Sequence, residues 1–237
     1  MISKHDTFVS RLVDLFLPRT CHVCGYRLAP AEEEVCLACR FSMPRTRYWL
    51  TPMDNPMVSM YLGIIPIQRA AAMYFYKRQG DTSRMIFAIK YYDYPNVGIT
   101  MGRTMAQTMG SKGFFDGIDM IVPVPLSRKR ERDRGYNQSA VIAEGIAQVT
   151  SIPVRTDVVA RIDFVQSQTT LSRIERMDNV TEVFECLKPD ELKGKHILIV
   201  DDVITTGSTT IELAKVLCSD PSTVVSIASL CLAGKHF

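Results

Sequence analysis

Residues 197–209 constrain this chain more than any other stretch, and they read Ile-Leu-Ile-Val-Asp-Asp-Val-Ile-Thr-Thr-Gly-Ser-Thr. Four consecutive branched apolar residues are typical of a buried parallel strand and are too few for a core helix. The adjacent carboxylates of Asp201 and Asp202 follow this strand. A run of small hydroxyl residues comes next, and a helical apolar pattern begins at Ile211. The stretch therefore predicts a strand, an acidic pair and a loop that opens a helix.

The loop has the composition of a phosphate site. Free backbone N–H groups at a helix N-terminus bind anions, and the helix dipole favours negative charge there. Gly207 lets the backbone approach a ligand closely, and the hydroxyls add donors. The two carboxylates can accept hydrogen bonds from vicinal ribose hydroxyls. An ordinary strand–helix turn with two solvated aspartates is the alternative, but folding alone does not require this pattern. The predicted sugar-phosphate site is Asp201, Asp202, Thr205, Thr206, Gly207, Ser208 and Thr209.

All 13 positions of this stretch resemble the phosphoribosyl pyrophosphate (PRPP) signature of type I phosphoribosyltransferases. The resemblance implies that PRPP binds here together with Mg2+, which would bridge the pyrophosphate and the ribose hydroxyls. In that chemistry the protein mainly positions the reactants and neutralises charge. No residue stands out as a general base, so the catalytic residues stay unknown.

A second phosphate-binding segment is expected where Pro123-Val124-Pro125 leaves another buried strand. In open α/β sheets, ligands bind at the carboxyl ends of the strands, where this turn and the acidic pair both fall. The net charge of +3 is small, but residues 128–134 hold five cations and two anions. Arginine suits phosphate because its planar fork binds two oxygens at once. A solvated basic loop is the alternative to a pyrophosphate loop that contains Arg128, Lys129, Arg130 and Arg134.

Two CxxC units lie near the N-terminus, at Cys21–Cys24 and Cys36–Cys39, and eleven residues separate them. Each unit presents two thiolates to one metal, so the two together predict a four-cysteine structural Zn2+ site. A dithiol pair or a disulfide is the alternative. Gly25 suits the tight turn after the first unit. No role is assigned to Cys186, Cys218 or Cys231.

The 237 residues allow one or two domains, and the composition is ordinary for a folded protein. We expect an apolar N-terminal helix and the four-cysteine module in residues 1–45, a proline-containing linker in 46–69 and an α/β domain in 70–237. No apolar run approaches the roughly 18 residues of a membrane span, and charges interrupt the N-terminal apolar patch, so we expect a cytoplasmic protein. Strands are predicted near 70–77, 119–122, 158–161, 197–200 and 224–232, and helices near 82–90, 97–109, 137–149 and 172–180.

Strands that alternate with helices imply a parallel, doubly wound α/β sheet. The order of motifs resembles the ComF family, whose fold is that of type I phosphoribosyltransferases with an N-terminal four-cysteine zinc module. The motifs are Val122-Pro123-Val124-Pro125-Leu126, Arg134-Gly135-Tyr136-Asn137-Gln138, Gln168, Arg176, Asn179-Val180, Phe184 and the PRPP loop.

The family resemblance implies a PRPP-binding protein that assists uptake or handling of single-stranded DNA alongside a competence helicase. An active phosphoribosyltransferase that uses an unidentified nitrogen nucleophile is the alternative, and a pure interaction module is a third. The last is disfavoured because every polar element of the PRPP loop is present. Tyr91, Tyr92 and Tyr94 either stack on a base or form a packed aromatic corner. The acceptor, the DNA preference and the oligomeric state stay open.

Overall fold

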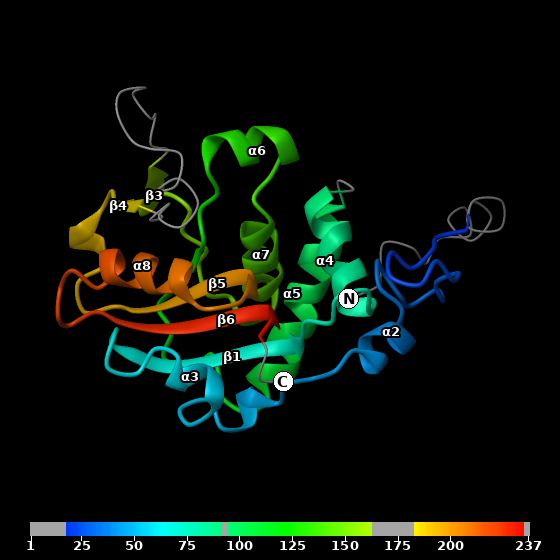
Figure 1. Cartoon of the computed structure of the whole chain (residues 1–237), viewed down its shortest axis with the longest axis horizontal. Coiled ribbons are helices and arrows are strands. Elements are labelled where there is room, and N and C mark those ends of the chain that lie inside the picture. The colour runs from blue at the N-terminus through cyan, green and yellow to red at the C-terminus, as the bar shows by residue number, and fades with distance from the viewer. Residues whose placement is uncertain (1–17, 92–93, 163–182, 235–237) are drawn as a thin grey trace, which may run out of the picture.

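The computed structural model describes residues 18–91, 94–162 and 183–234 (Figure 1). The expected N-terminal helix, the expected helix near 172–180 and Tyr92 lie outside these residues, as do Gln168, Arg176 and Asn179-Val180. Among the helices in the described ranges, none combines the length and the apolar character needed to cross a bilayer.

Four parallel strands form the central sheet in the order β1-β6-β5-β2 (Figure 1). The predicted α/β class is confirmed. A single bridge between Ile121 and Val154 extends the β2 edge. The strands are β1 (Ile67–Phe75), β2 (Met120–Pro123), β5 (His196–Ile204) and β6 (Val224–Leu232).

Both faces of the sheet are buried, which explains the continuous apolar run in β5. Ile197 and Ile199 belong to one apolar cluster, and Leu198 and Val200 belong to the other, as the two-residue period of a strand requires. The first cluster includes residues of α3 (Pro56–Ser59) and α8 (Ser208–Leu217). The second includes residues of α4 (Asp81–Tyr91), α5 (Pro95–Gly110) and α7 (Gln138–Thr150).

Helices α5 and α7 touch through their backbones. A Cβ on Gly102 would lie 2.2 Å from the Ile142 carbonyl oxygen, and one on Gly145 would lie 2.1 Å from that of Ile99. Any larger side chain at either position would push the helices apart. This contact fixes α7, and the N-terminus of α7 points toward the functional site.

The expected linker is part of the folded domain: residues 46–66 pack against the sheet, and residues 67–69 begin β1. Asn55 caps α3, and its amide nitrogen donates to the Ala70 carbonyl at 2.9 Å. The side chains of Trp49, Met57 and Tyr61 are buried. The segment also contains a 3-10 turn, η1 (Tyr48–Leu50).

A second, antiparallel sheet pairs β3 (Val159–Ile162) with β4 (Val183–Cys186). Its β4 strand was not expected from the sequence. The remaining elements are short: α2 (Leu37–Ser42), α6 (Arg128–Arg134) and η2 (Pro189–Glu191). Helix α6 stands away from the sheet at the end of two extended connections (Figure 1).

Candidate PRPP site

The phosphate loop is shorter than the sequence suggested. Strand β5 continues through both aspartates to Ile204, and α8 begins at Ser208. Gly207 occupies the N-cap with φ +78°, so it supplies no capping side chain. A long contact of 3.5 Å joins the Ser208 amide to Thr206 Oγ1. The first turn of α8 therefore keeps amide donors for an anion.

The buried side chain of Tyr61 packs against this loop. Its hydroxyl lies 3.0 Å from Thr210 Oγ1, and Thr210 in turn donates to the Gly207 carbonyl at 2.9 Å. A Cβ on Gly207 would lie 3.1 Å from the ring of the buried Tyr61, and the φ of +78° would strain any other residue, so both favour glycine there. Sequence reasoning missed Tyr61 because it lies in the expected linker.

The two aspartates have different partners. Asp201 Oδ1 accepts from Ser139 Oγ of α7 at 3.0 Å and from the Asp202 amide at 2.8 Å. Asp202 is 3% exposed, and its Oδ2 forms an ion pair with Lys90 Nζ of α4 at 2.9 Å. Burial, followed by the charge of Asp202, raises the pKa of Asp201 to about 7. The pair thus combines a carboxylate that faces Lys90 with a carboxyl whose pKa is raised to about 7.

The expected basic loop is a helix, α6. Ser127 Oγ accepts from the Arg130 amide at its start, and Gly135 with φ +77° ends it, so both signals for a helix were in the sequence. Arg130 and Arg134 are four residues apart and share a helix face. Both line the cleft that contains Asp201 and Asp202.

The other cations of α6 are placed differently. Lys129 and Arg132 are exposed and do not line this cleft. Arg128 is the first residue of the α6 helix. Arg134 lies over the Tyr91 ring at 5.3 Å from the centroid, which holds its guanidinium beside Lys90.

The cleft has a volume of about 130 Å³ and lies between the N-termini of α7 and α8. Val124, Pro125 and Thr209 contribute to its walls, so the two predicted phosphate segments meet here. Sequence reasoning missed Lys90, Gln138 and Ser139 as cleft residues, because they follow neither the acidic pair nor the basic run. Only Gln138 belonged to a quoted motif.

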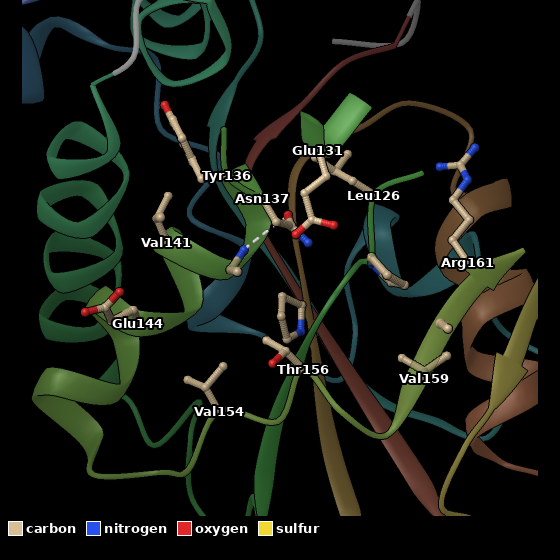
Figure 2. Close-up of a pocket in the computed structure, with 14 residues that line it drawn as sticks. Leu126, Glu131, Tyr136, Asn137, Val141, Glu144, Val154, Thr156, Val159 and Arg161 are labelled. Atoms are coloured by element: carbon tan, nitrogen blue, oxygen red, sulfur yellow. Dashed lines mark hydrogen bonds between the residues drawn. The ribbon is translucent and has the colours of Figure 1, made fainter. Parts of the chain in front are cut away.

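A larger cavity of about 680 Å³ adjoins the cleft and shares Pro125, Leu126 and Arg161 with it (Figure 2). Pro123 lines this cavity. Figure 2 shows Glu131 and Glu144 on its walls, from α6 and α7, and Asn137 at the start of α7, where its Oδ1 accepts from the Ser139 and Ala140 amides. Neither glutamate forms an ion pair with the residues that the structure describes.

Two of the three predicted aromatics are described, and both are exposed. Tyr91 packs on Phe87 with ring centroids 5.4 Å apart, and Tyr94 packs on His22 of the cysteine module at 4.0 Å. Tyr91 also lines a cavity of about 540 Å³ with Lys90 and Arg130. Tyr91 therefore lies beside the cations Lys90 and Arg130, whereas Tyr94 contacts the cysteine module.

The four N-terminal cysteines form a second site. One Sγ atom from each lies within 4.8 Å of all the others. The cluster could hold a metal ion. All four thiols are free, so the disulfide alternative does not describe this structure. The Val23 and Cys36 amides donate to Cys21 Sγ at 3.4 and 3.3 Å, and Gly25 has the expected positive φ of +77°.

Fold and cleft together define a phosphoribosyltransferase domain, and the sequence comparisons agree. A model described as "Phosphoribosyl transferase domain" matches residues 90–236. DNA utilization protein YhgH of Escherichia coli (strain K12) is 34% identical over 228 residues, which cover 92% of this chain and 98% of that protein. Competence protein F of Haemophilus influenzae is 35% identical over 100 residues, which cover 42% of this chain and 44% of that protein.

The chain therefore belongs to the ComF family of phosphoribosyltransferase-domain proteins, as the motif order predicted. A glutamine PRPP amidotransferase from B. subtilis, complexed with ADP and GMP, aligns with a TM-score of 0.40 at 19% identity. That alignment covers 61% of this chain and 30% of the amidotransferase.

Proposed function

We propose that the protein binds PRPP with Mg2+ in the cleft between α7 and α8. One observation carries the proposal: the carboxylates of Asp201 and Asp202 lie between two groups that suit phosphates. The α8 N-terminus would bind the 5-phosphate on one side. Arg130, Arg134 and Lys90 would bind the pyrophosphate on the other.

The cleft also fits the metal that accompanies PRPP. Mg2+ prefers oxygen ligands and binds through substrate phosphates plus one or two protein oxygens. Asp201 and Asp202 supply carboxylate oxygens at this position. The metal would stabilise negative charge on a departing pyrophosphate. The chain's own residues orient the ribose and neutralise the phosphates.

We infer that the cysteine cluster holds structural Zn2+. A tetrahedron of Zn–S bonds of about 2.3 Å has edges of about 3.8 Å. The Sγ atoms of Cys21 and Cys39 are 3.9 Å apart, and those of Cys24 and Cys36 are 3.8 Å apart. Amide donors to the sulfurs would stabilise the thiolates. The module would then hold α2 and Tyr94 against the main domain.

We also propose a role in handling single-stranded DNA, with a competence helicase as the expected partner. Two names among the relatives refer to DNA utilization and competence. Helix α6 offers Lys129 and Arg132 on its exposed side, apart from the cleft cations. A phosphate backbone could contact these side chains while PRPP occupies the cleft.

An active phosphoribosyltransferase is the second candidate, and the 680 Å³ cavity favours it. A transferase needs room for an acceptor beside C1 of PRPP. Glu131 and Glu144 would accept hydrogen bonds from N–H groups of a nitrogen nucleophile. Pyrophosphate release in the presence of PRPP, Mg2+ and a panel of nucleobases distinguishes this candidate from binding alone.

Isothermal titration with PRPP and Mg2+ tests the proposed site. Ser208→Glu places a negative charge in the first turn of α8, where it stabilises the helix but repels a phosphate. Asn96→Glu makes the same change of charge in the first turn of α5, at another exposed position outside the cleft. We expect S208E to abolish binding and N96E to leave it unchanged. Equal affinities for PRPP in both variants would overturn the proposal.

A further inference from the structure

Gln138, the first residue of α7, lines the cleft with an unused hydrogen-bond acceptor. Its side chain is 5% exposed, and its Oε1 is buried without a donor among the residues that the structure describes. The neighbouring Asn137 and Ser139 are different, because both make side-chain hydrogen bonds within the protein. Of these three neighbours, Gln138 is the one whose side-chain carbonyl has no donor in the described part of the chain.

A buried acceptor without a partner destabilises the folded state, and a leucine of similar size would avoid that cost. An unsatisfied group of this kind in a ligand cleft indicates that the ligand completes it. The donor cannot be a phosphate, because ionised phosphate oxygens only accept hydrogen bonds. The donors that PRPP carries are its ribose hydroxyls.

A second free acceptor lies on the next element. Asp201 Oδ1 accepts hydrogen bonds from Ser139 Oγ and from the Asp202 amide, and Asp202 Oδ2 has the charge of Lys90 Nζ at 2.9 Å as its ion-pair partner. Asp201 Oδ2 has no hydrogen bond from the described part of the chain. Gln138 Oε1 on α7 and Asp201 Oδ2 on β5 are thus acceptors of the cleft that have no donor among the described residues, and a ribose presents two adjacent hydroxyls.

We propose that Gln138 and Asp201 together bind the 2- and 3-hydroxyls of a ribose phosphate, so that Gln138 makes the cleft select ribose over 2-deoxyribose. The inference rests on the proposed PRPP site, and it assigns the sugar specificity of that site to the ribose hydroxyls of the ligand. It has a consequence for DNA. A DNA strand lacks the 2-hydroxyl and would leave the Gln138 carbonyl unsatisfied, so DNA contacts belong on the outer side of α6 rather than in the cleft.

The test compares ribose 5-phosphate with 2-deoxyribose 5-phosphate, which differ by one hydroxyl. Both are titrated without Mg2+, so metal coordination cannot produce the difference. The wild type should bind the ribose form about tenfold more tightly, the loss expected when one buried acceptor goes unpaired. Gln138→Leu should bind both sugars with the affinity that the wild type has for the deoxy form.

The ligand-free melting temperature separates a binding role from a structural one. Gln138→Leu, and Gln138→Met as a second unbranched replacement, should melt at or above the wild-type temperature because each removes an unsatisfied acceptor. A structural role would lower the melting temperature. Gln107→Leu, at an exposed position of α5, is the matched control, and it should retain the sugar preference.

The outcomes distinguish this inference from the proposed function. Suppose that the wild type binds PRPP, that S208E does not, and that the wild type binds both sugars with equal affinity. This result overturns only the role of Gln138 and leaves the proposed PRPP site intact. A tenfold preference for the ribose form that persists in Gln138→Leu and Gln138→Met also overturns only the role of Gln138. Failure of the wild type to bind PRPP or either sugar overturns both proposals.

Discussion

Lys90 Nζ lies 2.9 Å from Asp202 Oδ2, and this ion pair joins α4 to the carboxyl end of β5. The side chains are 21% and 4% exposed. Because the carboxylate is buried, the lysine neutralises a charge that the protein would otherwise have to expose or protonate. The pair belongs both to the fold and to the cleft, since Lys90 and Asp202 line it together.

Removing the lysine should therefore cost stability. We expect Lys90→Met to lower the free energy of unfolding by about 3 kcal/mol, because it leaves Asp202 buried without its cation. Lys90→Met with Asp202→Asn should recover most of that loss. Lys215→Met is the matched control, since it breaks an exposed pair with Glu212 and should change stability by less than about 0.5 kcal/mol. Urea unfolding measures the stability of all three variants. Equal losses of unfolding free energy in Lys90→Met and Lys215→Met would contradict a buried ion pair at Lys90.

Asp201 should make the stability of the ligand-free protein depend on pH. Its pKa is raised to about 7 by burial and by the nearby Asp202. The folded state therefore holds a proton that the unfolded chain releases at much lower pH. This stabilising contribution is complete below the unfolded pKa near 4, falls steadily as the pH rises from there, and is lost once the pH passes about 7. The stability advantage of Asp201→Asn over wild type should therefore grow by about 2–3 kcal/mol between pH 5 and pH 8. A difference that does not vary with pH would refute the assignment.

The two faces of α6 should bind different phosphates. Arg130→Ala with Arg134→Ala removes two cleft cations and should weaken PRPP more than ribose 5-phosphate, which lacks pyrophosphate. Lys129→Ala with Arg132→Ala removes the same charge from the exposed side. It should spare PRPP and flatten the salt dependence of single-stranded DNA binding by about 1.4 in log–log slope. Fluorescence anisotropy at several salt concentrations measures this slope. Identical effects of the two double variants on both ligands would be inconsistent with the division of faces.

One zinc per chain is expected at Cys21, Cys24, Cys36 and Cys39, and Cys36→Ser with Cys39→Ser should abolish it. The cluster shares its apolar environment with Met43 and Trp49, so loss of the metal should lower the melting temperature of the whole chain. Elemental analysis and calorimetry test the two statements. Protein purified without chelator that contains no zinc would rule out the site.

Local signals in the sequence were sufficient for the main elements of the fold. The apolar run 197–200 predicted a central strand because the sheet is covered on both faces, and Asn137 marked the start of α7 because it caps that helix. The basic run was less clear. Its charges suggested a loop, whereas Ser127 and Gly135 at its ends make it a helix.

The other cleft residues could not be deduced from local pattern. Lys90, Ser139 and Tyr61 are far from the acidic pair in sequence, and only tertiary packing brings them to it. Each looks ordinary in its own segment: a lysine late in an amphipathic helix, a serine in a first turn, a tyrosine after a short helix. The sequence therefore indicated which ligand to expect, while the structure shows how charge and hydrogen bonds are distributed around it.

The location of the 5-phosphate is the central claim, and backbone amide NMR tests it most directly. Titration with PRPP and Mg2+ should produce its largest amide shifts at Thr206–Thr209, with a second group at Gln138 and Ser139. Both groups should be absent in S208E and present in N96E. Large shifts confined to the cysteine module or to the exposed side of α6, with the amides of residues 206–209 unmoved, would contradict the account.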